Sequence, residues 1–220
     1  MTPESAGHRN GAVPLVHAVT TDEIVARTDF IDVACGVMGA LGHRGALHLR
    51  AGRLTGARLE LLGETLAAAQ QVTGAWLVVN DRVDVARAVG AHGAQLTSQS
   101  LTVADARRAA PGLAIGASVH AVPEGVSAAE SGADWLVAGR VFDAEGRPGA
   151  TGIGMEFVEA LIASVRIPVI AIGGVRPQHC RVLRLAGVHG VAVIRGIWDA
   201  PNAERAAMEY LSCYDDAAGA

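Results

Sequence analysis

From residue 15 onward, short apolar runs alternate with longer stretches rich in alanine and leucine, and this alternation limits the possible folds more than any other feature. The short runs are rich in β-branched residues, which is typical of buried strands. They lie at residues 15–19, 46–50, 76–80, 93–96, 114–119, 135–141, 168–172 and 190–194. We therefore expect eight parallel strands joined by right-handed crossovers.

The stretches between these runs show helical spacing. Residues 58–71 place Leu59, Leu62 and Leu66 on one face, and Gly187 closes a helix expected at 177–186. Further helices are expected at 81–90, 155–165 and 203–211. The first crossover, residues 22–42, is the least clear because Gly36 and Gly39 weaken a helix.

Eight strand–helix units favour an α/β fold of the (β/α)₈ type, a TIM barrel in a single domain. A doubly wound open sheet is the alternative, but no glycine fingerprint follows the first strand. A chain of 220 residues fits one barrel with short loops. We place the barrel at residues 14–214, between a flexible N-terminal tail (1–13) and a C-terminal tail (215–220).

Charge and composition exclude several classes of function. The net charge of −4 and the scattered basic residues argue against a nucleic-acid partner. No apolar stretch is long enough to span a bilayer, and residues 1–13 lack the apolar core of a secretion signal. Three widely spaced cysteines suit a reducing compartment. We expect a cytoplasmic protein with a small-molecule partner and no membrane partner, and leave open whether it forms a homo-oligomer.

Polar or glycine residues end most of the predicted strands. In a (β/α)₈ barrel these carboxyl ends meet at one mouth, where functional residues gather. A cap or a turn explains any single one of them, whereas the whole ring favours a functional site. The substrate-binding candidates at these ends are Arg50, Asn80, Asp81, Ser118 and Gly139.

The ends of the seventh and eighth strands carry a phosphate signal. Gly173 and Gly174 stand between an apolar strand and a helix, where backbone N–H groups approach an anion. Arg195 follows the eighth strand, and its guanidinium suits the same phosphate.

Among the eight histidines, His120 is the best candidate for proton transfer. It follows the fifth strand, and imidazole both donates and accepts protons near neutral pH. A structural role at the rim is an equally good explanation from position alone. His48 alternates with Arg50 along the second strand, so we expect it to line the same pocket.

Asp81 is open to three interpretations: helix cap, metal ligand or substrate contact. A metal that bridges phosphates needs a second carboxylate, and the natural donor loop, residues 97–100, reads Thr-Ser-Gln-Ser. We therefore expect neither a metal nor another cofactor.

Four blocks of sequence resemble the thiamine phosphate synthase superfamily. They lie at residues 47–50, 79–96 (with the motif NDRVDVA), 118–120 (SVH) and 167–194 (beginning IPVIAIGG), and so span most of the barrel. Synthases of this superfamily carry a lysine after strand two and an acidic loop after strand four, which serve a pyrophosphate and its Mg²⁺. Here Gly52 and residues 97–100 stand at those positions, so we assign the chain to the metal-free thiazole tautomerase (TenI-type) branch.

That resemblance implies an isomerase of thiamine biosynthesis. It would convert a carboxylated dihydrothiazole ethyl phosphate into the aromatic thiazole phosphate, with His120 as proton shuttle and Arg50 pairing with the substrate carboxylate. Gly173, Gly174, Ile194 and Arg195 would hold the phosphate. Two features depart from the tautomerase pattern: Gly52 stands where that branch has a lysine, and the loop at 144–149 differs. We expect Arg147 and Arg195 to compensate; the rival hypothesis is a pocket for a different anionic ligand. The alternatives are a thiamine phosphate synthase and a non-catalytic barrel that binds a thiazole phosphate.

Overall fold

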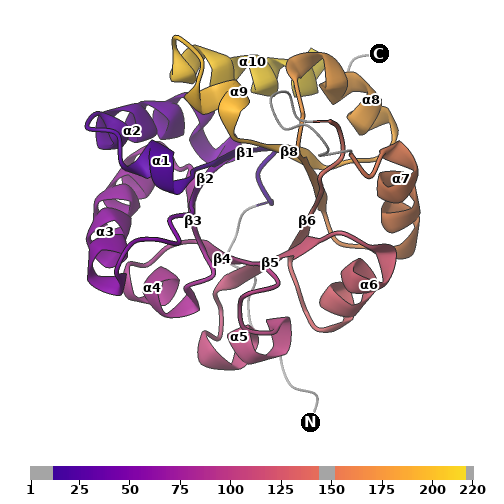
Figure 1. Ribbon diagram of the computed structural model, residues 1–220, viewed down its shortest axis with the longest axis horizontal. Coiled ribbons are helices and arrows are strands. Elements are labelled where there is room, and N and C mark those ends of the chain that lie inside the picture. Colours follow the sequence, from indigo (N-terminus) through magenta and orange to yellow (C-terminus); the bar gives the residue numbers. More distant parts are fainter. Residues whose placement is uncertain (1–11, 144–151, 217–220) are drawn as a thin grey trace.

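The computed structural model describes residues 12–143 and 152–216 as a closed barrel of eight parallel strands in sequential order (Figure 1). The strands are β1 (Val16–Val19), β2 (Gly45–Leu49), β3 (Trp76–Asn80), β4 (Gly93–Leu96), β5 (Ala114–Val119), β6 (Trp135–Gly139), β7 (Val169–Ile172) and β8 (Gly190–Val193). β8 pairs with β1 and closes the ring, with Ala192 opposite His17. The predicted fold class is confirmed.

Helices surround the strands on the outside of the ring (Figure 1). They are α1 (Asp22–Val25), α2 (Phe30–Leu41), η1 (Gly42–Arg44), α3 (Gly56–Thr73), α4 (Val83–Ala88), α5 (Val103–Ala109), α6 (Val122–Glu130), α7 (Met155–Ser164), η2 (Pro177–His179), α8 (Cys180–Leu185), α9 (Arg195–Trp198) and α10 (Ala203–Asp216). In the part of the chain that the structure describes, no helix combines the length and apolarity needed to cross a membrane.

The first crossover forms a longer helix than its glycines suggest. α2 covers both Gly36 and Gly39 because it packs against α10. A Cβ at Gly36 would lie 2.1 Å from the Glu204 carboxylate, so the missing side chain lets the two helices approach closely. Tertiary packing therefore outweighs the weak helix propensity of glycine.

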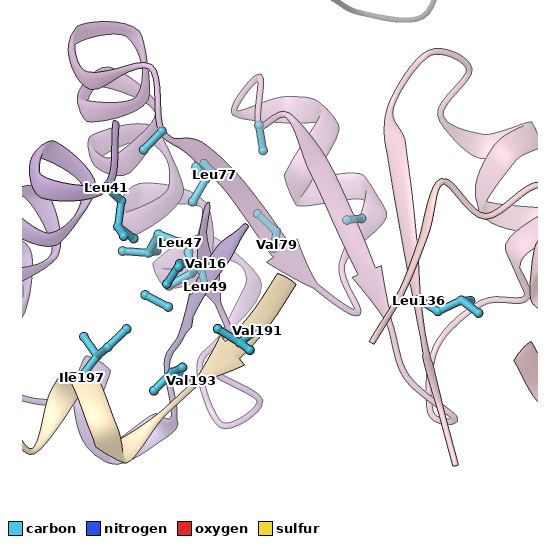
Figure 2. Packing of buried hydrophobic residues seen from close by; sticks show 14 of the residues in the cluster. Val16, Leu41, Leu47, Leu49, Leu77, Val79, Leu136, Val191, Val193 and Ile197 are labelled. Atoms are coloured by element: carbon cyan, nitrogen blue, oxygen red, sulfur yellow. The ribbon is translucent and has the colours of Figure 1, made fainter. Parts of the chain in front are cut away.

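Strand residues alternate between two apolar cores. The larger core lies between the strands and the helices and includes Val16, Leu47 and Leu77 (Figure 2). A smaller core fills the barrel interior, where Trp76 and Trp135 pack edge to face with ring centroids 6.2 Å apart. The interior is thus a packed core, and any ligand site must lie at one of its ends.

The segment before β1 lies against the amino end of the barrel. Val13 packs against the interior core, and its carbonyl oxygen accepts a hydrogen bond from His189 Nε2 at 2.6 Å. The carbonyl oxygen of Pro14 bonds His17 Nε2 at 2.9 Å. With this end covered, the carboxyl end is the mouth that remains for a ligand.

Candidate functional site

A cavity of about 1270 Å³ lies at the carboxyl end of the barrel. Its lining comes from the loops after β1, β2, β5, β6, β7 and β8. Seven of the residues predicted from sequence lie in this lining: Arg50, His120, Gly139, Gly173, Gly174, Ile194 and Arg195. Arg147, another predicted residue, lies in the loop 144–149, outside the described residues.

The turn after β7 is built of two glycines with left-handed backbone conformation. Gly173 has φ +94° and Gly174 has φ +65°, a region that side chains with a Cβ rarely adopt. A Cβ on Gly173 would lie 2.8 Å from Arg140 Cα, and one on Gly174 would lie 2.5 Å from the Asp143 carbonyl oxygen. The loop after β6 therefore packs directly on this turn and fixes the backbone that lines the cavity.

The chain after β8 enters the short helix α9 beside this turn. The amides of Ile197 and Trp198 both donate to the carbonyl oxygen of Ile194 at 3.1 Å. The N–H of Gly196 lies in the first helical turn, where amides have no intrahelical acceptor. Ile194, Arg195 and Gly196 line the cavity, so the turns at residues 173–175 and 194–196 together form one side of it. We call them the two glycine turns.

Among the residues that the structure describes, five arginines line the cavity, namely Arg50, Arg53, Arg140, Arg176 and Arg195. Arg50 is exposed, and its backbone is fixed because its N–H donates to Thr20 Oγ1 at 2.9 Å while that hydroxyl donates to its carbonyl oxygen at 3.0 Å. Of the four acids in the described lining, Glu23 lies 3.4 Å from Arg53 and Asp199 lies 2.8 Å from Arg27. The other two, Asp22 and Asp143, accept hydrogen bonds from the backbone amides of Arg53 and Gly152. The mouth therefore suits an anionic ligand.

Sequence reasoning missed Arg53 and Arg176. Arg53 stands four residues beyond the end of β2, and Arg176 stands two residues beyond Gly174. Their position in loops at the carboxyl end was the available signal, because all such loops face the mouth. Apart from Arg147, the residues predicted from sequence lie at or next to the strand ends, whereas Arg53 and Arg176 lie farther into the loops.

His120 is exposed at the end of β5 and lines the cavity. Its backbone N–H donates to Glu124 Oε2 at 2.7 Å, and its ring Nδ1 bonds the carbonyl oxygen of Gly139. Because a carbonyl oxygen only accepts, Nδ1 carries the hydrogen and Nε2 of the neutral ring is an acceptor. The hydrogen bond from Nδ1 thus fixes the orientation of the ring and leaves Nε2 as the acceptor nitrogen.

His48 lies deeper than predicted. It is 1% exposed and does not line the cavity; its Nε2 lies 2.8 Å from His17 Nδ1. His17 donates from Nε2 to Pro14, so its Nδ1 accepts the hydrogen of His48. Burial lowers the pKa of His17 to about 4 and also lowers the pKa of His48. Both rings are neutral parts of the barrel interior, so the expectation that His48 lines the pocket is wrong.

Ser118 also lies below the cavity, in a line of polar groups. The Trp135 indole N–H donates to Gln95 Oε1 at 2.9 Å, and Gln95 Nε2 donates to Ser118 Oγ at 3.0 Å. Ser118 is half-buried and is not part of the cavity lining. It therefore satisfies the hydrogen bonds of the interior and supports the floor of the site.

Asn80 and Asp81 lie apart from the cavity, at the edge between β3 and β4. Asp81 has φ +62°, and α4 begins after it with Arg82 at the N-cap position. Asp81 Oδ1 accepts hydrogen bonds from the Thr97 amide at 3.0 Å, from the Thr97 hydroxyl at 2.7 Å and from the Ser100 hydroxyl. Asp81 thus closes the loop after β4 and does not cap α4.

These groups do not fit the divalent metal that the synthase resemblance implies. Oδ1 of Asp81 accepts hydrogen bonds from the Thr97 and Ser100 hydroxyls, and the loop at residues 97–100, which would supply a second ligand, contains no carboxylate. Within residues 12–143 and 152–216, no three His, Cys, Asp or Glu side chains cluster as metal ligands. We derive no step through a metal at this position.

Comparison with known proteins decides the family. The model of the family described as thiamine monophosphate synthase matches residues 16–197. The chain belongs to this family. It is 38% identical over 158 residues to a thiamine-phosphate synthase of Pyrococcus furiosus, covering 72% of this chain and 76% of the relative. A thiamine-phosphate synthase of Chlorobium luteolum is 34% identical, covering 88% of this chain and 90% of the relative.

A solved structure agrees with these relatives. The thiamine phosphate pyrophosphorylase of Pyrococcus furiosus superposes with a TM-score of 0.81 at 33% identity, covering 92% of this chain and 96% of that protein. These relatives are named as synthases and the solved one as a pyrophosphorylase; none is named a tautomerase. The predicted thiazole tautomerase activity, and the isomerase class with it, are therefore wrong. The chain therefore matches relatives named as synthases even though Gly52 and residues 97–100 depart from the synthase pattern.

Proposed function

We propose that this chain is a transferase that forms thiamine phosphate and releases pyrophosphate. The observation that best supports this proposal is the arginine-lined cavity at the two glycine turns, in a chain of the thiamine monophosphate synthase family. The relatives' names supply the product and, from pyrophosphorylase, the second product. The substrates would be a thiazole bearing a phosphate ester and a pyrimidine bearing a methylene pyrophosphate.

The reaction balances without a proton transfer. The ring nitrogen of the thiazole forms a bond to the pyrimidine methylene carbon, and the bond from that carbon to the pyrophosphate oxygen breaks. The electron pair leaves with pyrophosphate, and the thiazole becomes a thiazolium cation. Negative charge grows on the leaving group, so prepositioned cations around it lower the barrier.

The cavity offers groups for both substrates. The backbone of the two glycine turns, with Arg195, is proposed to hold the phosphate ester, and Arg50, Arg53 and Arg140 to hold the pyrophosphate. His120 Nε2 is proposed to accept a hydrogen bond from a substrate ring. A volume of about 1270 Å³ exceeds the usual range for one small ligand, which suits two substrates bound together.

A non-catalytic barrel that binds a thiazole phosphate is the second candidate. The observation that favours it is the engagement of Asp81 by Thr97 and Ser100, which leaves no carboxylate pair for a metal-assisted leaving group. Such a protein would bind both ligands in the cavity and yield no product.

The test is to incubate the protein with both substrates, with added Mg²⁺ and separately with EDTA, and to detect thiamine phosphate after oxidation to its fluorescent thiochrome. The proposal expects product, and expects Arg50→Ala to lower the rate at least about tenfold, as loss of one charge-stabilising donor does. The matched control is Arg58→Ala, because Arg58 is exposed on α3 and does not line the cavity. Binding of both substrates without product in either condition favours the second candidate.

A further inference from the structure

Tyr210 on α10 contacts both sides of the proposed phosphate site. Its hydroxyl donates to the carbonyl oxygen of Val175 at 3.1 Å, in the turn after β7. A Cβ built on Gly196, in the turn after β8, would lie 2.3 Å from the same hydroxyl oxygen. One phenol oxygen therefore touches both glycine turns, although Val175 and Gly196 are 21 positions apart in the sequence.

The arrangement of the helices explains how α10 reaches this place. α10 packs against α9 and against η2, the elements that follow the two glycine turns. Tyr210 is 2% exposed, and it also borders the cavity. Burial raises the pKa of Tyr210 to about 12, so the hydroxyl keeps its hydrogen and donates over the physiological range.

We propose that Tyr210 is a positioning residue that sets the spacing of the two glycine turns and thereby the affinity for the phosphate group of the substrate. The inference rests on the proposed function, because it takes these turns as the seat of a phosphate ester. Backbone amides bind an anion well only when they converge on it. Without the contact to the Tyr210 hydroxyl, each turn would move more freely, and ordering the turns around the phosphate would cost more free energy. The hydroxyl acts through the backbone of Val175 and Gly196.

The same helix supplies a matched control. Tyr214 lies four residues beyond Tyr210 and is 1% exposed, and its hydroxyl is buried without a hydrogen-bond partner among the described residues. Its ring lies under the guanidinium of Arg184, 5.9 Å away, and it does not line the cavity. Tyr210→Phe and Tyr214→Phe therefore make the same chemical change at two buried sites of α10, and only the first changes a contact to the turns.

The experiment measures the dissociation constants of thiazole phosphate and of the unphosphorylated thiazole alcohol by calorimetry. We expect Tyr210→Phe to bind thiazole phosphate about fivefold more weakly, the usual effect of losing one hydrogen bond, and to bind the alcohol unchanged. Tyr214→Phe should leave both constants unchanged. Unaltered phosphate affinity in Tyr210→Phe, an equal loss for the alcohol, or the same loss in Tyr214→Phe would each overturn the inference. Wild-type protein that does not bind thiazole phosphate would overturn the proposed function as well.

A second variant tests the contact without relying on the hydrogen bond. Gly196→Ala places a methyl group against the Tyr210 hydroxyl, so it should spread the turns and weaken phosphate binding. Without that hydroxyl, the nearest atoms to the new Cβ of residue 196 are Val193 Cγ1 at 3.0 Å and Tyr210 Cζ at 3.2 Å. Combining Gly196→Ala with Tyr210→Phe should therefore restore part of the lost phosphate affinity. We expect the double variant to bind at least about twofold more tightly than additive losses predict, since contacting residues couple. Strictly additive losses would contradict the contact.

Discussion

At the scale of single residues, Asp81 and His48 show how neighbours decide what a functional group does. Asp81 Oδ1 is held by the hydroxyls of Thr97 and Ser100, so the carboxylate organises a loop. His48 lies in a hydrogen-bonded line with His17 inside the barrel. Both residues resemble site residues in the sequence, and in both cases the partners became apparent only in three dimensions.

The loop after β4 provides a test of the metal argument. Ser100→Asp would place a second carboxylate beside Asp81, where like charges repel unless a cation lies between them. We expect 10 mM Mg²⁺ to raise the melting temperature of Ser100→Asp by several degrees relative to its metal-free form. The wild-type protein and Ser100→Asn should shift by less than about one degree, because neither holds a carboxylate pair. A Mg²⁺-dependent rise in wild type would contradict our account of Asp81.

The buried histidines predict a dependence of stability on pH. The pKa of His17 is about 4 in the folded protein and 6.5 in its ordinary state, so the unfolded chain binds more protons between these values. The contribution of His17 to the free energy of unfolding should therefore be complete above pH 6.5. It should decrease as the pH drops toward 4, by roughly 3 kcal/mol in all. Urea titrations at several pH values measure this slope.

His17→Gln keeps a donor and an acceptor at this position but does not titrate, so its slope should be shallower. His43→Gln, at an exposed position, should keep the wild-type slope. Equal slopes for His17→Gln and wild type would show that the loss of stability in acid arises elsewhere.

At the scale of elements, the strands could be predicted from the sequence. Most are apolar runs with β-branched residues, bounded by polar residues or glycines. The structure begins β2 at Gly45, one residue before the predicted run, and ends β6 at Gly139, two residues before the predicted end. α4 starts later than predicted because Asp81 takes a left-handed conformation to reach the loop after β4. Such differences depend on contacts between segments, which no local pattern contains.

The sequence also could not predict how far each strand residue lies from the mouth of the barrel. Alternation correctly put His48 and Arg50 on one side of the chain, yet two residues of strand span about 6.6 Å along the barrel. Arg50 therefore borders the cavity while His48 is enclosed below it. The glycine turn after β7 was predictable because a glycine pair after a strand is a local signal, whereas the contact of Tyr210 with the turns depends on the packing of α10.

We expect a single methyl group added inside the barrel to lower the stability of the protein strongly. A Cβ on Gly116 of β5 would lie 2.2 Å from Trp135 Cε2 and 2.3 Å from Gln95 Oε1, both fixed in the interior. Gly116→Ala should lower the free energy of unfolding by about 3 kcal/mol, at the upper end for overpacking. Gly52→Ala, which has open space around its Cβ, should change stability by less than about 0.5 kcal/mol. Equal stability of the two variants in urea would contradict the packing of Trp135.

At the scale of the whole molecule, the closed barrel places the two glycine turns and the cavity-lining arginines at one mouth, while Val13 and Pro14 lie against the other end. The fold was predictable because eight repeated strand–helix units have few compact arrangements. The activity was not, because the assignment to a branch rested on Gly52 and residues 97–100 alone. Those residues favoured an isomerase, which the names of relatives that match 72% and 88% of the chain contradict.

The amount of pyrophosphate released per thiamine phosphate formed tests the central claim most directly. With both substrates present, the account predicts one pyrophosphate for each thiamine phosphate, and no pyrophosphate when the thiazole phosphate is omitted. Release of pyrophosphate without thiamine phosphate, or no release while both substrates are bound, would contradict it.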